Sequence, residues 1–345
     1  MPPYIIQKAF VSILRLLTRL GNAIPAPDPT TTETIYIPSR TPNRTIKAHL
    51  YSPASSTTET QDTESSPAKQ SPSSSPSPSP SPSPSPTTTT PKATAQPTPI
   101  LLNLSGSGFT IPSHGIDGPF ASYITANTPY SVLDMQYRLA PENPFPAALE
   151  DACDALQYIL SRPERFDRTK IGLSGFSAGA GIVVSVAANA ERLLPPGVGK
   201  GAVSTLVAFY PVVDGTVPAA EKKAELDLGQ KMFNGSVPRW LMRFFEGCYL
   251  RNGPGVDDER ISPGKAGARL DGFPQRCLFV TCEGDSLAKE ADDLAGRLRD
   301  EEREVRLVKV KGVGHAWDKV AKEGSWEAQE RDRAYAAVVD MLNQG

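Results

Sequence analysis

Histidine and cysteine are scarce in this sequence, and their scarcity narrows the chemistry that the chain can perform. Among its 345 residues are 3 histidines and 4 cysteines. The cysteines, at positions 153, 248, 277 and 282, show no CxxC spacing, so the sequence gives no sign of a zinc or dithiol redox motif. We expect free, mostly buried thiols, which are typical of a cytoplasmic protein.

A strong net charge and long apolar runs are also absent. The 36 basic and 38 acidic side chains leave a net charge of -2, which gives no electrostatic case for binding nucleic acid. No run of about 18 uncharged apolar residues occurs, so we expect no ordinary membrane span. The length suits one large α/β domain or two small ones.

Proline is abundant, but most of the surplus lies in one segment, residues 53–97, which runs through Thr, Ser and Glu into repeated Ser-Pro pairs. Almost nothing in this segment can be buried, so the entropy lost on ordering it would not be offset by burial of apolar surface. We predict a disordered insertion with polyproline II character inside a strand–strand connection. A phosphorylated or protein-docking segment is the alternative interpretation.

The stretch Tyr4–Leu20 is apolar at helical spacing, with Lys8, Arg15 and Arg19 along one side. This pattern predicts an amphipathic helix within residues 1–30. Three interpretations stay open: a cap over an active site, a helix that lies on a membrane surface, and a targeting peptide. Lys8 and Arg15 interrupt the apolar stretch, which argues against a secretory signal.

Short apolar strands alternate with helices over residues 31–345. We expect strands at Glu33–Ile37, Arg44–Tyr51, Ile100–Leu104, Tyr130–Tyr137, Lys170–Leu173, Ser204–Tyr210, Cys277–Cys282 and Val305–Val310. We expect helices at Ala147–Leu160, Ala180–Arg192, Leu287–Arg299 and Glu327–Asn343. The first two strands form an antiparallel hairpin, and the alternation that follows predicts an α/β fold. Its central sheet is mostly parallel and is covered by helices on both faces.

Gly175–Gly179 reads Gly-Phe-Ser-Ala-Gly, which is the G-x-S-x-G pattern of a nucleophile elbow. The chemistry needs a sharp turn from strand to helix with a serine at its apex. The glycines let backbone pass where a Cβ atom would clash. A glycine-rich turn without function can show the same pattern by chance, but here the predicted strand and helix supply the required context.

Tyr137–Asp151 reads Tyr-Arg-Leu-Ala-Pro-Glu-Asn-Pro-Phe-Pro-Ala-Ala-Leu-Glu-Asp. Together with the elbow, this stretch resembles the signature of the hormone-sensitive-lipase-like esterases, a family of α/β-hydrolases (α/β-hydrolase fold-3). The resemblance covers Glu33–Tyr51 and Pro99 to the last residue, and it leaves 53–97 outside. It implies an α/β-hydrolase fold with a helical cap, for which residues 1–30 and the segment 214–250 are the candidates.

The resemblance also implies a catalytic triad in the chain order Ser, Asp, His. Ser177 matches the nucleophile, Asp285 the acid and His315 the base. The remaining histidines fit less well, since His49 lies in the early hairpin and His114 precedes the nucleophile. The rival carboxylates, on a helix face and in a turn after the base, are Asp292 and Asp318.

The loop that stabilises the oxyanion departs from the family pattern. It usually reads His-Gly-Gly-Gly, whereas here Ser105–Gly108 reads Ser-Gly-Ser-Gly. The implied N–H donors to the developing oxyanion are Gly106, Ser107 and Ala178. A positive φ at Ser107 would cost about 1 kcal/mol. Phe176 stands where an acidic residue is common beside the nucleophile.

These features predict a carboxylic-ester hydrolase that acts through an acyl-enzyme on small to medium apolar esters, with no metal or organic cofactor. A non-catalytic small-molecule receptor is the alternative, since some members of this family have become receptors. Such a switch usually loses a triad residue, and none is lost here. A third interpretation places the function in the Ser/Pro-rich segment. The expected partner is an ester, and membrane contact through the first helix stays open.

Overall fold

The computed structural model describes residues 3–21, 32–54 and 96–344, except for 197, 200, 252 and 302. The predicted disorder of residues 53–97 falls, apart from the ends of that segment, outside the described residues. The part of the 1–30 assignment beyond Gly21 does so as well.

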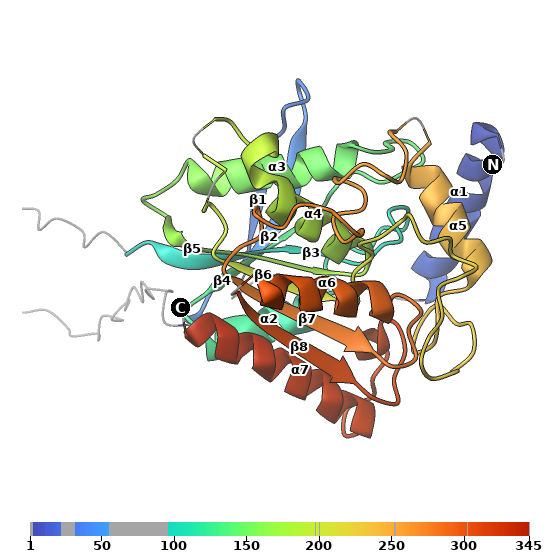
Figure 1. Cartoon of the computed structure of the whole chain (residues 1–345). Coiled ribbons are helices and arrows are strands. Elements are labelled where there is room, and N and C mark those ends of the chain that lie inside the picture. Colours follow the sequence, from blue (N-terminus) through green and yellow to red (C-terminus); the bar gives the residue numbers. More distant parts are fainter. Residues whose placement is uncertain are drawn as a thin grey trace, which may run out of the picture.

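Eight strands form one sheet in the order β1-β2-β4-β3-β5-β6-β7-β8 (Figure 1). They are β1 (Thr32–Pro38), β2 (Thr45–Tyr51), β3 (Thr98–Leu104), β4 (Ser131–Met135), β5 (Phe166–Phe176), β6 (Thr205–Phe209), β7 (Arg276–Cys282) and β8 (Glu304–Val310). The pairs from β4 to β8 are parallel, whereas β1 and β2 run antiparallel to their neighbours. The predicted hairpin and the predicted mostly parallel sheet are confirmed.

Helices cover both faces of the sheet (Figure 1). On one face lie α3 (Ala147–Leu160), α4 (Ala178–Leu193) and α6 (Ala288–Asp300), and on the other lie α2 (Gly118–Asn127) and α7 (Trp326–Asn343). The four cysteines are buried and unpaired, as predicted. The sequence did not indicate α2, because the apolar residues of GPFASYITAN are not confined to one side of a helix.

The carboxyl ends of the parallel strands meet at one edge of the sheet. The loops that follow β3, β5, β7 and β8 therefore lie together there, at the place where open α/β sheets bind their ligands. These loops carry Ser105–Gly108, Ser177, Asp285 and His315. The topology thus gathers the predicted site residues from four distant parts of the chain.

Two helices lie beyond this edge, α1 (Tyr4–Gly21) and α5 (Arg239–Tyr249) (Figure 1). They touch through aromatic rings, since the Phe10 ring lies 4.7 Å from that of Phe244. Every helix in the described ranges is too short or too polar to span a bilayer.

Candidate active site

Ser177 lies at the apex of the turn between β5 and α4, with φ 50° and ψ -119°. This left-handed geometry is strained for a residue with a Cβ atom and is typical of functional sites. The flanking glycines make the turn possible. A Cβ atom at Gly179 would lie 2.2 Å from the Leu104 carbonyl oxygen, and one at Gly175 would lie 2.7 Å from the Ala180 nitrogen. Glycine is therefore required at both positions, as the motif predicted.

The structure brings the three predicted triad residues into one hydrogen-bonded line. His315 Nε2 lies 2.8 Å from Ser177 Oγ, and His315 Nδ1 lies 2.6 Å from Asp285 Oδ2. Asp285 is fully buried, and its Oδ1 accepts a hydrogen bond of 3.1 Å from the Leu287 N–H. Such a line allows an imidazole to take the serine proton while the carboxylate fixes its tautomer and stabilises the imidazolium.

The rival carboxylates have other partners. Asp292 accepts a hydrogen bond from Thr281 Oγ1 at 2.9 Å and pairs with Lys309 at 2.8 Å. Asp318 accepts hydrogen bonds from the hydroxyl groups of Tyr210 (2.7 Å) and Tyr335 (3.0 Å). Neither is therefore placed to orient the histidine.

The loop that holds His315 is anchored by the segment 214–250, a feature that the sequence did not reveal. The His315 N–H donates to the Gly235 carbonyl at 2.7 Å, and the Asn234 N–H donates to the His315 carbonyl at 2.7 Å. The Gly314 N–H donates to Asn234 Oδ1 at 2.9 Å. The two loops touch closely, since a Cβ atom at Gly314 would lie 2.1 Å from the Gly235 nitrogen. The role of Gly235 and Gly314, which let the two loops approach closely, becomes apparent only when the two loops are seen together.

The Ser105–Gly108 loop is held by Tyr137. The Tyr137 hydroxyl donates to the Ser105 carbonyl at 2.6 Å and accepts from Ser107 Oγ at 2.6 Å. Positive φ angles occur at Gly108 (52°) and Phe109 (60°), and Ser107 is not among the residues that have one. The strain considered for Ser107 therefore does not arise, and its side chain instead helps to fix the loop.

The predicted N–H donors line the space beside the serine. A Cβ atom at Gly106 would lie 3.2 Å from the Ser177 Cβ, so the backbone of the loop runs directly against the nucleophile. Within the described part of the chain, the N–H groups of Gly106, Ser107 and Ala178 have no acceptor. Ala178 also opens α4, whose N-terminus favours negative charge. A ligand oxygen can therefore receive these hydrogen bonds.

A buried ion-pair network lies behind the nucleophile. Lys319 Nζ lies 2.6 Å from Asp117, 2.9 Å from Asp318 and 3.4 Å from the centre of the Phe176 ring. Burial alone would lower the pKa of Lys319, but the two carboxylates outweigh it and raise that pKa, so the ammonium group stays charged. A cation therefore lies over the face of Phe176, the aromatic residue that directly precedes the nucleophile.

An apolar cavity of about 260 Å³ lies beside Ser177 and His315. This volume lies just below the usual range of ligand pockets, which begins at about 300 Å³. Much of the apolar lining comes from the loop after β3 and from the segment 214–250, and it includes Phe109, Ile111, Met232, Phe233, Met242 and Phe245. Such a wall favours an apolar acyl or alcohol group.

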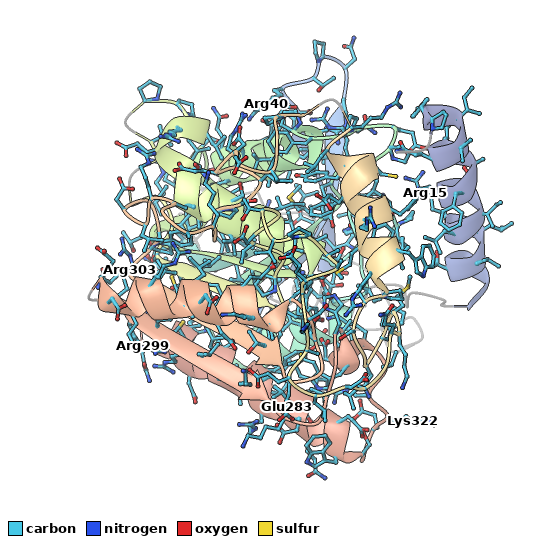
Figure 2. The ribbon with its side chains drawn as sticks, turned by 45° about the vertical axis from the view of Figure 1, so that its right-hand side comes forward. Arg15, Arg40, Glu283, Arg299, Arg303 and Lys322 are labelled. Atoms are coloured by element: carbon cyan, nitrogen blue, oxygen red, sulfur yellow. The ribbon has the colours of Figure 1, made fainter. Side chains whose placement is uncertain are left out.

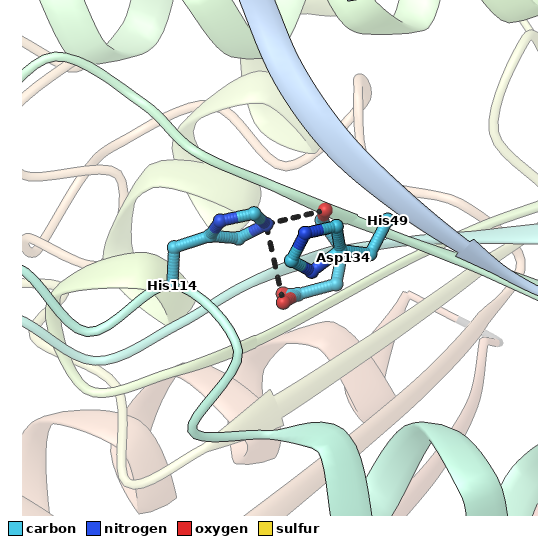
Figure 3. Close-up of side chains that lie close together, drawn as sticks. All are labelled: His49, His114 and Asp134. Carbon is cyan, nitrogen blue, oxygen red and sulfur yellow. Dashed lines mark hydrogen bonds and ion pairs between the residues drawn. The ribbon is translucent and has the colours of Figure 1, made fainter. Parts of the chain in front are cut away.

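One group among the described residues could be considered for a metal, namely His49, His114 and Asp134 (Figure 3). The His114 Nε2 atom lies 3.0 Å from the Asp134 carbonyl oxygen, and the two imidazoles stack at 4.3 Å and 27°. Stacked rings direct their in-plane lone pairs side by side, whereas a metal requires them to converge. Both Asp134 carboxylate oxygens already accept hydrogen bonds, from Asn103 and Gly115. We therefore assign this group no metal.

Comparison with known proteins shows to which family this fold belongs. A model of the alpha/beta hydrolase fold family matches residues 101–319, which is more than half of the chain. This chain is an α/β-hydrolase of the fold-3, hormone-sensitive-lipase-like esterase family. The family resemblance inferred from the sequence is confirmed.

Individual relatives of this α/β-hydrolase agree. It is 27% identical to the probable carboxylesterase 1 of Arabidopsis thaliana, over 64% of this chain and 69% of that protein. It is 27% identical to an AB hydrolase superfamily protein of Schizosaccharomyces pombe, over 48% of this chain and 47% of that protein. The structure of EstE1, a carboxylesterase cloned from a metagenomic library, is 24% identical with a TM-score of 0.67, and 97% of each chain is covered. The α/β-hydrolase is therefore a carboxylesterase-like hydrolase.

Proposed function

We propose that this α/β-hydrolase cleaves carboxylic esters with Ser177 as nucleophile, His315 as general base and acid, and Asp285 as the orienting carboxylate. The proposal rests on the continuous line of two hydrogen bonds, 2.6 Å and 2.8 Å long, that joins the three side chains. The strained turn that exposes the serine adds to it.

In the first half of the reaction, Ser177 Oγ attacks the acyl carbon while His315 Nε2 takes its proton. The N–H groups of Gly106, Ser107 and Ala178 then stabilise the oxyanion of the tetrahedral intermediate. The intermediate collapses as the imidazolium gives its proton to the departing alcohol, which leaves the acyl group on the serine. Water, activated by the same imidazole, releases the acid and restores the enzyme.

We propose small to medium apolar esters as substrates. The apolar lining and modest volume of the cavity support this range. We further propose that α1 and the segment 214–250 act as a cap, because Thr18 and Phe245 both line the cavity. The name carboxylesterase, borne by the Arabidopsis relative, agrees with an ester substrate.

The test combines a fluorophosphonate probe with turnover of p-nitrophenyl acetate, butyrate and octanoate. Wild type is expected to be labelled and to prefer the shorter esters, whereas Ser177→Ala loses both labelling and turnover. Ser161→Ala, which changes an exposed serine that follows α3, is the matched control and should behave as wild type. Folded wild type that neither labels nor turns over would overturn the proposal and favour a small-molecule receptor.

A further inference from the structure

α1 turns most of its large apolar side chains towards solvent, whereas its inner side mixes polar and apolar residues. Gln7 and Val11 are buried on the inner side. The outer side carries side chains that are 36% to 79% exposed, namely Ile5, Ile6, Phe10, Ile13, Leu16 and Leu17. These are six of the eleven exposed large apolar residues in the described part of the chain. A surface helix of a soluble monomer normally has the reverse orientation.

The orientation of α1 is fixed by a polar anchor on its inner side. Arg15 donates to the carbonyl groups of Thr110 (2.8 Å) and Ala140 (2.9 Å), and it forms a bidentate pair with Glu142, both bonds 3.0 Å long. Figure 2 shows Arg15 on the side of α1 that faces α5. Because a bidentate guanidinium pair is geometrically specific, α1 cannot roll to bury its apolar side without breaking these bonds.

The apolar surface continues onto α5. The Phe10 ring lies 6.1 Å from that of Trp240, which is 59% exposed. We call the six outer residues of α1 together with Trp240 the α1–α5 face. The charged side chains exposed on α1, on α5 and just after α5 are all basic, namely Lys8, Arg239, Arg243 and Arg251. α1 contains no acidic residue, and the single one of α5, Glu246, is partly buried.

The remaining parts of the chain cannot cover this face. Among the described residues none buries it. Residues 1–2, 22–31 and 55–95, which lie outside the description, contain two large apolar residues between them, Met1 and Ile24. Two side chains cannot cover seven, so the partner must come from elsewhere.

We propose that the α1–α5 face docks onto an anionic lipid surface. The apolar side chains of α1 would enter the boundary between headgroups and acyl chains, with the helix lying in the plane of the membrane. The basic side chains around them would meet anionic headgroups. A wide apolar face, basic flanks and the lack of exposed acid fit this surface better than they fit a second copy, whose identical basic flank would repel.

Docking of this kind would turn the cavity towards the membrane. Thr18 of α1 and Met242 and Phe245 of α5 line the cavity, while the outer sides of the same helices form the α1–α5 face. An apolar ester dissolved in the bilayer would therefore reach the cavity without crossing much water. The docking proposal itself does not depend on the activity of Ser177.

The test is flotation of the full chain with vesicles of phosphatidylcholine alone or mixed with phosphatidylglycerol. Wild type should float with the mixed vesicles, and less so with neutral vesicles or in high salt. Ile13→Glu/Leu17→Glu should weaken binding at least about tenfold, since it replaces two apolar side chains that would enter the acyl boundary with charged ones. The matched control, Tyr36→Glu/Trp326→Glu, changes two exposed residues outside the face and should float as wild type does.

Circular dichroism and thermal melting of both double variants provide a check on folding that needs no enzymatic activity. Wild type that stays unbound, or a folded Ile13→Glu/Leu17→Glu variant that binds as well as wild type, would overturn the proposal. Sedimentation that reveals a dimer which only this variant disrupts, without flotation, would also overturn it and assign the face to a second copy.

Discussion

The anchor beneath the histidine loop gives the sharpest test of how the site is positioned. Asn234 holds this loop with its side-chain oxygen and its backbone N–H. Asn234→Gly removes the side-chain acceptor alone, because glycine readily adopts the φ of 51° found at this position. The Gly314 N–H is then left without its partner, while the backbone bonds between Gly235 and His315 can persist.

The magnitude follows from that single lost bond. Leaving a buried N–H unsatisfied costs about 1 to 3 kcal/mol, and water that enters the space would reduce the cost. If the loss falls on the geometry of His315 in the transition state, kcat should fall about tenfold, because about 1.4 kcal/mol corresponds to that factor. KM should stay within about twofold, since Asn234 does not line the cavity.

The assay is steady-state hydrolysis of p-nitrophenyl butyrate across a pH range. Asn234→Asp keeps an acceptor in place and should restore most of kcat. Asn43→Gly replaces another asparagine of positive φ, in the exposed turn between β1 and β2, and should be neutral. An unchanged kcat and pH profile in Asn234→Gly would refute the reasoning, and so would equal losses in the glycine and aspartate variants.

Three further outcomes are expected. Tyr137→Phe removes the hydroxyl that joins Ser105 to Ser107, so kcat should fall about tenfold with a similar melting temperature, and an unchanged kcat would show that the loop is held otherwise. Burial, helped by a neighbouring imidazole, lowers the pKa of His114 from 6.5 to about 4, so the folded state binds this proton less readily than the unfolded chain. The free energy of unfolding should then drop by up to about 3 kcal/mol as the pH falls from 6.5 to 4, and urea titrations should show a smaller drop in His114→Gln. Deleting residues 57–93 should leave turnover and melting nearly unchanged, and a loss of folding would contradict a passive insertion.

Local patterns in the sequence were sufficient to predict the sheet and most of the helices that cover it, although not α2. Apolar runs of strand length alternate with helical segments, and the sheet follows from that alternation. The nucleophile elbow could also be predicted from the sequence, because its glycines and its serine are close together in the chain and form one backbone turn. Asp285 and His315 carry little local signal, and it was the family resemblance that pointed to them.

The contacts that hold the site in place could not be read in the same way. Asn234 and His315 lie on segments far apart in the chain, and an Asn-Gly pair reads as an ordinary turn until its partner loop is known. Lys319 likewise meets Asp117 only after the sheet has formed. The sequence also did not predict the orientation of α1. Its periodicity defines an apolar face but does not say whether that face points towards the protein or towards solvent.

The connection between β2 and β3 leaves the sheet and returns to it at the end where the parallel strands begin. Tyr51 ends β2 beside Val132 near the start of β4, and Thr98 opens β3 beside Phe166 at the start of β5. Ser177 lies at the opposite end of the strands, directly after the last residue of β5. A carrier domain or an affinity tag spliced into residues 55–95 would thus be tethered behind the catalyst, so the enzyme could be immobilised on a bead through the interior of its own chain with its cavity facing outward.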